Sequence, residues 1–200
     1  RGTFDVTVNH VVGWNDGGEW QNYTRQFPTP AASYYVIGRL SSGGAAIHAQ
    51  LDEVTAGAKT ANQTLQKLGE FNPGRSTGNW DIMEFFPLEA WPGEPAIVGL
   101  GGERTIRLTI LPGANEDQDY FMFIPIPGMV ADTTAPTVPS NVRVTQALSR
   151  VVALEWNAST DASGRVGYEI ARDGIVLGMT GGTTFVDTGA EPNKNYTYTV

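Results

Sequence analysis

Two tryptophans stand where their rings could pack against a ligand. Trp14 lies in the stretch VGWNDGGEW, ahead of a turn at Gly17-Gly18, and Trp80 follows Gly78-Asn79. A flat indole ring beside amides and carboxylates is a surface on which a sugar ring stacks, and turns are where binding residues gather. The pattern leaves open that both rings belong to the core of a β-protein. Their placement at turns favours ligand binding.

Two groups of carboxylates accompany these rings. Asp16 and Glu19 flank the Gly17-Gly18 turn, and we expect them to accept hydrogen bonds from sugar hydroxyls or to form the turn, with Glu19 assigned to the binding site. Glu116, Asp117 and Asp119 form a second group. Oxygen ligands from alternate residues of a loop suit Ca²⁺, although the glycine and distal glutamate of an EF-hand are absent. Structural calcium is therefore one interpretation, and a solvated turn is the other.

Catalytic side chains are scarce. The chain has no cysteine, only His10 and His48, and no serine in a G-x-S-x-G elbow. Acyl transfer therefore lacks a recognisable nucleophile and base. Two carboxylates are the minimum for glycoside hydrolysis, so a small hydrolase is kept as a third-ranked alternative. We expect a protein that is not an enzyme, although it could serve as an accessory region of a glycoside hydrolase or polysaccharide lyase.

Short β-strands must position these residues. Apolar segments are brief and bounded by Gly, Pro, Asn or Asp, and Thr105–Leu111 alternates most clearly. Residues 49–68 could pass for a helix, but Gly57 and the β-branched residues favour two strands and a loop. The glycines of Gly99–Arg104 predict a hairpin turn. The strands expected in the first part of the chain are Trp20–Phe27, Tyr34–Leu40, Ile47–Leu51, Thr64–Phe71, Trp80–Phe86, Ala96–Leu100, Thr105–Leu111 and Tyr120–Ile126.

The amino-acid composition of the chain changes at Met129. The segment MVADTTAPTVPS is rich in proline and threonine and has no large aromatic residue, which predicts an extended linker over residues 129–140. We therefore expect one domain at 1–128 and a second at 141–200. The second is predicted to contain strands at Asn141–Thr145, Val151–Trp156, Gly167–Arg172, Ile175–Leu177, Thr184–Asp187 and Asn195–Val200.

Composition and charge exclude several classes of partner. A hydrophobic content of 40% is that of a globular protein, and a net charge of −8 disfavours nucleic acid and anionic membranes. No apolar run approaches the roughly 20 residues that span a bilayer, so we expect no membrane insertion. The absence of cysteine excludes disulfides and thiolate metal sites. Abundant Thr, Gly and Asn suit an extracellular bacterial β-protein, and the first residue, Arg1, suggests a mature or excised fragment.

The second domain resembles a fibronectin type III domain. The resemblance covers Thr134–Val200 and rests on TAPTVPSNVRVT, on Trp156 in VALEWNASTD, on YEIARDG, and on the closing FVDTG and NYTYTV. It implies an immunoglobulin-like sandwich with Trp156 in its core. The family continues with a final strand beyond the position of Val200, so we expect this domain to lack its last strand.

The first domain resembles a carbohydrate-binding module of family six, which has a galactose-binding-like jelly roll. The resemblance runs through VGW, GGEWQNYTRQF, SYYVIGRLSS, TGNWDIMEFFPL, ERTIRLTI and DQDYFMFIP. It implies that Trp14 and Trp80 grip a sugar ring and that Asp117 or Asn115 hydrogen-bonds its hydroxyls. The family commonly has Asn where Asp117 stands, and the opening strand with paired calcium-binding glutamates does not precede Arg1. Only Asp119 then remains at a position that matches a calcium ligand.

These observations predict an all-β chain, a jelly-roll β-sandwich followed by a smaller, incomplete immunoglobulin-like β-sandwich. The predicted function is non-catalytic binding of a polysaccharide or other glycan within a larger secreted bacterial protein, with the fibronectin type III domain as a spacer. The alternative is a structural or adhesive subunit of a cell-surface or filament assembly, with self-association or neighbouring domains of the same polypeptide as partners. Calcium is the one cofactor considered, and the expected location is extracellular or at the cell surface.

Overall fold

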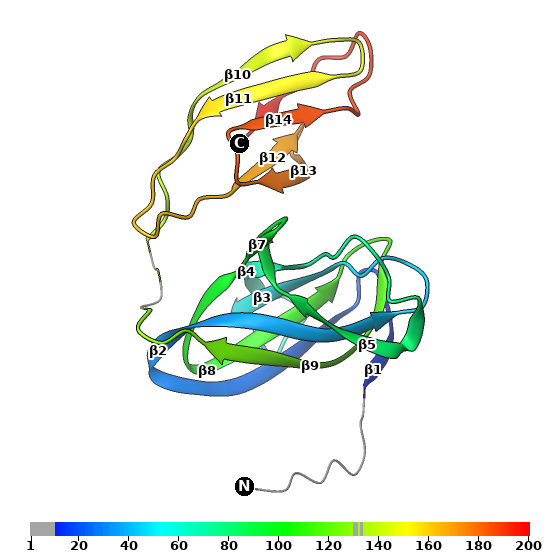
Figure 1. Ribbon diagram of the computed structural model, residues 1–200, viewed down its shortest axis with the longest axis vertical. Helices are drawn as coiled ribbons and strands as arrows, with labels where there is room; N and C mark the ends of the chain where they lie inside the picture. Colours follow the sequence, from blue (N-terminus) through cyan, green and yellow to red (C-terminus); the bar gives the residue numbers. More distant parts are fainter. Residues whose placement is uncertain (1–10, 130–131, 133) are drawn as a thin grey trace, which may run out of the picture. The chain divides into compact units, whose positions relative to one another are not determined.

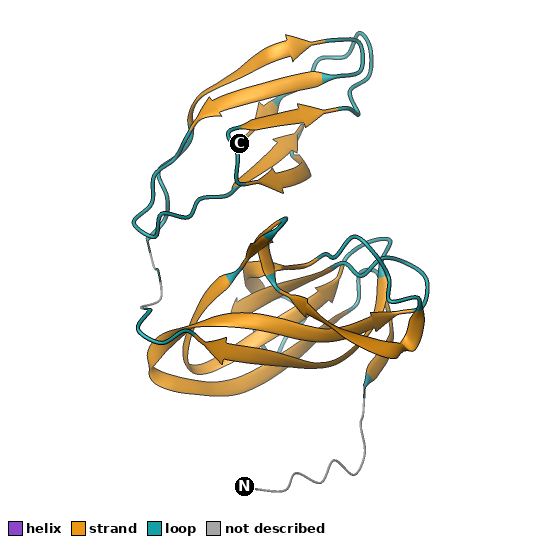
Figure 2. Cartoon of the chain, in the orientation of Figure 1, coloured by secondary structure: helices purple, strands orange, loops and turns teal. Residues whose placement is uncertain are grey.

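The fold is all-β, as the alternating apolar pattern predicts. The computed structural model describes residues 11–129, 132 and 134–200, and these form fifteen strands. Figure 2 shows strands and loops throughout the described chain. None of the described residues belongs to a helix of the length and apolar character needed to cross a membrane. The chain divides between Ala131 and Asp132 into two compact units.

The first unit is a sandwich of two antiparallel layers (Figure 1). One layer contains β1, β9, the second half of β2, and β5, whereas the other contains the first half of β2, then β8, β3, β4, β6 and β7. Its strands are β1 (Val12–Asp16), β2 (Trp20–Ser42), β3 (Ala49–Ala56), β4 (Thr64–Phe71), β5 (Asn79–Pro87), β6 (Glu89–Trp91), β7 (Glu94–Pro95), β8 (Ile97–Ile110) and β9 (Asn115–Pro125).

Two long strands pass from one layer to the other. The sequence predicts a break after Phe27 and a hairpin turn at Gly99–Arg104, but both predictions are wrong, because β2 and β8 each run through these segments. Phe27 pairs with Gly102 and Ala32 with Leu100, so residues 28–31 of β2 stand opposite Gly101 alone. A bulge of this kind bends a strand without ending it. The glycines mark that bend.

Two further strand boundaries differ from the sequence prediction. The segment around Trp14 was expected in a loop but forms β1, and the acidic segment after Ala114 belongs to β9 instead of a loop. Both segments are strongly polar and lack a clean alternation, so pattern alone gives no strand signal there. Backbone pairing between the two segments makes both of them strands, with Asn15 opposite Glu116 and Asp16 opposite Asn115. The prediction of two strands within residues 49–68 is confirmed by β3 and β4.

The core of the first unit lies between its two layers. Phe71 of β4 stacks on Phe121 of β9 with ring centroids 5.7 Å apart, although these strands are not hydrogen-bonded neighbours. Gly38 of β2 leaves room for Phe71, since an added Cβ would lie 3.1 Å from that ring. Alternate residues of β2 and β8 point inward and are buried, as strand geometry requires. They include Tyr34, Val36, Leu40, Ile106, Leu108 and Ile110.

The second unit has two sheets of three strands, in the orders β10-β11-β14 and β13-β12-β15. Trp156 is buried and meets Tyr168 edge to face at 5.3 Å, so the structural role predicted for this tryptophan is confirmed. The strands are β10 (Ser140–Ala147), β11 (Val152–Asn157), β12 (Tyr168–Arg172), β13 (Ile175–Thr180), β14 (Thr184–Asp187) and β15 (Tyr198–Thr199).

The bend between layers provides a test of the fold. We expect Gly101→Ala to destabilise the first unit by about 1–3 kcal/mol, because crowding of a packed site costs that much and the new Cβ would lie 2.6 Å from Cα of Ala31. Gly44→Ala is the control, since nothing lies within 4 Å of its added Cβ. Hydrogen exchange of the β2 and β8 amides during urea titration measures the effect. Equal protection in the two variants would contradict this account of the bend.

Candidate functional site

Four neighbouring strands bring the predicted binding residues to one end of the first unit. In the layer β1-β9-β2-β5 (Figure 1), Asp117 of β9 pairs with Ser41 of β2, and Asn79 of β5 pairs with Ser42. Trp14 lies on β1 beside Asp117, and Trp80 follows Asn79 on β5. The structure therefore places Trp14, Asp117 and Trp80 on three of these four strands, at one end of the layer, which is called the binding edge below.

Trp14 is displayed by an unusual backbone conformation. Its side chain is 95% exposed, and its φ of 63° lies in the left-handed region, which costs roughly 1–2 kcal/mol for a residue with a Cβ. The residue sits in a bulge between Val12 and Asn15. Its backbone N–H donates to Oδ1 of Asp117 at 2.9 Å, so this carboxylate holds the bulge in place.

Gly13 completes this arrangement. A Cβ at Gly13 would lie 2.9 Å from Oδ1 of Asp117, so only glycine lets β1 approach the carboxylate so closely. Strain that surrounding contacts maintain is often found at binding sites. Asp117 was predicted to bind sugar hydroxyls directly. Its position adds a second role, which is to orient Trp14 through the backbone.

Trp80 is packed along one edge and open elsewhere. Its side chain is 40% exposed. The indole lies directly against Gly43, where any Cβ would collide with the ring nitrogen and its neighbours. Its backbone carbonyl accepts a hydrogen bond from Oγ of buried Ser41 at 2.6 Å. These contacts fix the ring in one orientation while leaving surface available for a ligand.

The two tryptophans are separated by the width of the layer. From β1 to β5 there are three strand spacings, which put the backbones about 14 Å apart. Asp117 and Ser41 lie on the strands between them. A site of this width suits an oligosaccharide that crosses the strands and contacts each ring at a different sugar.

Glu19 and Asn115 lie near the same edge but have local partners. Oε2 of Glu19 accepts a hydrogen bond from the backbone N–H of Asp16 at 3.0 Å, which confirms the predicted turn. Asn115 pairs with Asp16 and lies with its Oδ1 3.4 Å from Oγ of Ser42. Both side chains shape the edge, and their assignment as sugar ligands stays a prediction.

Trp20 marks a second open surface that the sequence reading left as core or support. It is 39% exposed, and the Arg107 guanidinium lies 4.3 Å from its ring centroid. Trp20, Glu19 and Gln21 line an open hollow of about 520 Å³. The alternation of Trp20 with inward-facing Gln21 could have indicated this exposure. Ser41 was also missed, because a serine beside a predicted strand carries no signal of its own.

The acidic residues of β9 point to different faces. Glu116 is fully buried, whereas Asp117 is half-buried on the other side of the strand. Asp119 forms an ion pair with Arg39. No group of three or more Asp, Glu, His or Cys side chains that could hold a metal ion occurs among the residues that the structure describes. The calcium site at Asp119 thus stays a prediction without a matching ligand set.

Glu116 is an unusual buried carboxyl group. Neither of its side-chain oxygens has a hydrogen-bond partner of good geometry within the described structure. Burial has the larger effect on its pKa and raises it to about 8, while the nearby backbone of His48 acts to lower it. Close by, a buried polar network joins Asn15 to Gln21 at 2.5 Å and Gln21 to the Tyr23 hydroxyl at 2.8 Å. Gln118 donates to both Gln21 and Tyr23. Polar groups therefore fill the core directly behind the binding edge.

The one histidine that the structure describes has a structural role. Nε2 of His48 lies 2.9 Å from Oε2 of Glu70, and Lys67 contacts the other carboxylate oxygen at 2.6 Å. The hydrogen bond from His48 is the main reason that the pKa of Glu70 falls to about 2. His10 lies outside the described residues. These contacts engage the His48 side chain, which lies just before β3, with residues of β4.

Comparison with known proteins finds similarity over a limited stretch. No family model matches the chain. A segment is 42% identical over 71 residues to an alpha-amylase of Niallia circulans, covering 36% of this chain and 6% of that protein. Identity to a gellan lyase of a Bacillus species is 41% over 70 residues, covering 34% of this chain and 3% of the lyase. Chitinase A1 of Niallia circulans is 41% identical over 69 residues, covering 34% of this chain and 10% of the chitinase.

These relatives are carbohydrate-active enzymes, and the shared segment is a small part of each. The chain spans 3% to 10% of the length of these three proteins. The similarity therefore connects this chain with polysaccharide-degrading proteins through a segment of about a third of its length.

The buried carboxyl group predicts a pH dependence of stability. Because the folded-state pKa of Glu116 is about 8, above its ordinary value of 4.5, the folded protein keeps a proton that the unfolded chain releases. Stability should therefore fall between about pH 4.5 and pH 8, by a few kcal/mol in total. Glu116→Gln should remove this part of the decline and leave the variant more stable than the native chain at pH 8.

Urea unfolding at several pH values measures this difference. Glu103→Gln is the control, since it removes an exposed carboxylate at the bend of β8. Parallel pH profiles for the native chain and Glu116→Gln would show that Glu116 is ionised in the folded protein.

Proposed function

We propose that this chain is a non-catalytic polysaccharide-binding region of a larger secreted bacterial protein. The first unit binds the glycan, and the second acts as a fibronectin type III spacer. The observation that carries the proposal is the display of Trp14, which is 95% exposed in a left-handed conformation. Exposing an indole in a strained backbone costs free energy, so a ligand that covers the ring is the simplest reason for it.

The binding mechanism follows from the edge of the sandwich. Trp14 and Trp80 stack on pyranose rings at the two sides of the layer, and Asp117 lies between them as a hydrogen-bonding group, while buried Ser41 holds the backbone of Trp80. The Trp80 ring, which packs on Gly43, loses little conformational entropy on binding. The surface is shallow, so affinity for a single site is expected in the micromolar to millimolar range, about −4 to −8 kcal/mol. Neighbouring modules would raise this by avidity.

The proposal assigns the similarity to polysaccharide-degrading enzymes to the second unit. The matched segments of 69 to 71 residues have the length of the unit Asp132–Val200. This length, with the fibronectin type III pattern of the same residues, supports a shared spacer. An alpha-amylase, a gellan lyase and a chitinase each match a segment of this length, which supports a module that serves several catalytic partners. The proposal places the whole protein outside the cell, where such polysaccharides occur.

Removal of the displayed rings tests the proposal. Trp14→Ala and Trp80→Ala should each weaken binding roughly ten-fold or more, since stacking and burial of an indole are worth at least 1.4 kcal/mol. Retardation in affinity gels that contain soluble polysaccharides measures this effect. Trp14 makes no side-chain contact needed for folding at 95% exposure, so its variant separates binding from stability.

Phe85→Ala is a matched control, because Phe85 is an exposed ring of the same layer that pairs opposite Arg39, away from Ser41. Unchanged retardation of both tryptophan variants, in gels that retard the native chain, would remove the proposed site.

A second candidate function is structural or adhesive. The second unit exposes apolar side chains on β10, β13 and adjoining turns, among them Val138, Leu148 and Ile175 at 85%, 58% and 70% exposure. Exposed apolar groups favour protein contacts where they form one contiguous surface. Light scattering over a range of concentrations should show assembly if the chain is a subunit of a filament or surface layer. A constant monomer mass would remove this candidate.

A further inference from the structure

The charges around the two tryptophans point to a particular class of glycan. We propose that the binding edge selects polysaccharides whose sugars carry a protonated amine, such as chains of glucosamine, over neutral and uronic-acid glycans. This inference rests on the proposed function, because it concerns the ligand of the same site. It is carried by two independent features, namely carboxylates without ion-pair partners and open indole faces.

Carboxylates lie close to both tryptophans along the chain or on the neighbouring strand. Asp16 and Glu19 follow Trp14 at the β1–β2 turn, Asp81 follows Trp80, and Asp117 lies between them. Within the described part of the chain, none of these four forms an ion pair with Lys, Arg or His. Asp16, Glu19 and Asp81 are exposed. Their negative charge is therefore directed into the solvent that a ligand would replace.

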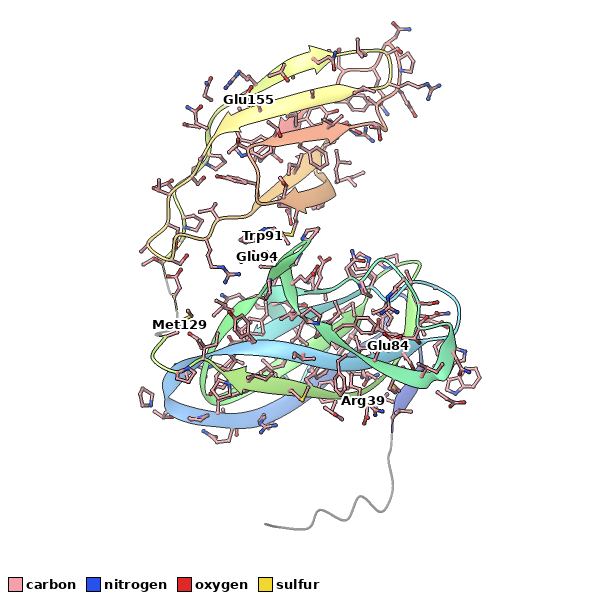
Figure 3. All side chains as sticks on the ribbon, viewed as in Figure 1. Arg39, Glu84, Trp91, Glu94, Met129 and Glu155 are labelled. Atoms are coloured by element: carbon pink, nitrogen blue, oxygen red, sulfur yellow. The ribbon has the colours of Figure 1, made fainter. Side chains whose placement is uncertain are left out.

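The basic groups of the adjoining elements are already engaged. Arg75, in the loop before β5, contacts Glu84 through two guanidinium nitrogens at 2.7 Å and 3.2 Å. Arg39 of β2 pairs with Asp119. Figure 3 labels Arg39 and Glu84 on their strands of this layer. These pairs offset the charges of Arg75 and Arg39, whereas Arg107 lies over Trp20 on the other layer. The unpaired carboxylates near Trp14 and Trp80 therefore favour a negative local potential, in a chain with a net charge of −8.

The tryptophans add attraction for a cation. An ammonium group over the face of an indole is drawn by the negative π-face, and tryptophan is the strongest of the aromatic residues in this respect. Trp20 shows the same chemistry within the protein, since the Arg107 guanidinium lies 4.3 Å from its ring centroid. Trp14 has no such internal partner among the cation–π contacts of the described residues. Its faces remain for the ligand.

These features rank three classes of sugar. A glucosamine unit gains stacking, an ammonium–carboxylate attraction and a cation–π contact. A neutral unit such as glucose or N-acetylglucosamine gains the stacking alone. A uronate places a carboxylate among like charges and is disfavoured. The most informative comparison is between glucosamine and N-acetylglucosamine oligomers. They share one backbone, but the nitrogen is a charged amine in the first and a neutral amide in the second.

The experiment is isothermal titration of the intact chain with glucosamine and N-acetylglucosamine oligomers of equal length, and with oligogalacturonate, at pH 5.5 and low salt. We expect the glucosamine oligomer to bind at least five-fold more tightly than its acetylated counterpart, and the uronate to bind most weakly. The preference should shrink in 0.5 M salt, since exposed charges are screened. Equal or tighter binding of the acetylated oligomer overturns the inference but leaves the proposed function intact.

Variants assign the preference to individual carboxylates. Asp16→Asn and Asp81→Asn should each weaken binding of the glucosamine oligomer roughly two- to five-fold more than they weaken binding of the acetylated oligomer, as expected for exposed charge pairs. Glu103→Gln removes the same charge at the distant bend of β8 and should change neither. An equal loss for Glu103→Gln would reduce the preference to net charge and overturn the assignment to this edge. Absence of binding to every oligomer would count against the proposed function itself.

Discussion

The first unit depends on two strands that belong to both of its layers. Because β2 and β8 run through the bend at residues 28–31 and Gly101, the layers cannot shift independently, and the loops at the other end of the sandwich are held at a fixed separation. A backbone contact as close as that between Gly101 and Ala31 allows no side chain. The position of the binding edge is therefore set by a glycine at the far end of the same strands.

At the binding edge, hydrogen bonds to the backbone determine how the two tryptophans are positioned. Asp117 accepts the N–H of Trp14, Ser41 donates to the carbonyl of Trp80, and Gly13 and Gly43 allow the close approach of each partner. Pre-organised groups of this kind lower the entropic cost of binding. Small residues and one carboxylate thus determine how two large rings are presented.

Sequence reasoning reached the fold class and the exposed tryptophans, for identifiable physical reasons. Alternation in β8 and the Gly17-Gly18 turn depend on neighbouring residues, so local pattern predicts them. The continuity of β2 and the placement of Asp117 beneath Trp14 depend on residues more than 70 and 100 positions away. Such long-range pairing leaves no local trace. The glycines near Gly101 were misread for the same reason, since a bend and a hairpin need the same residue.

The polar segment of β9 gives little information about the pairing register of this strand. In NEDQD, every residue from Asn115 to Asp119 is polar, so inward and outward positions look alike to a folding chain. A slip by one residue would exchange the buried Glu116 for Asp117. Contacts made from β9 distinguish the registers, since the rings of Phe121 and Phe123 pack on Phe71 and Phe27 and Gln118 donates to Gln21 and Tyr23. The alignment of Asp117 with Trp14 thus depends in part on aromatic rings several positions further along β9, although these rings pack against the core and not at the proposed site.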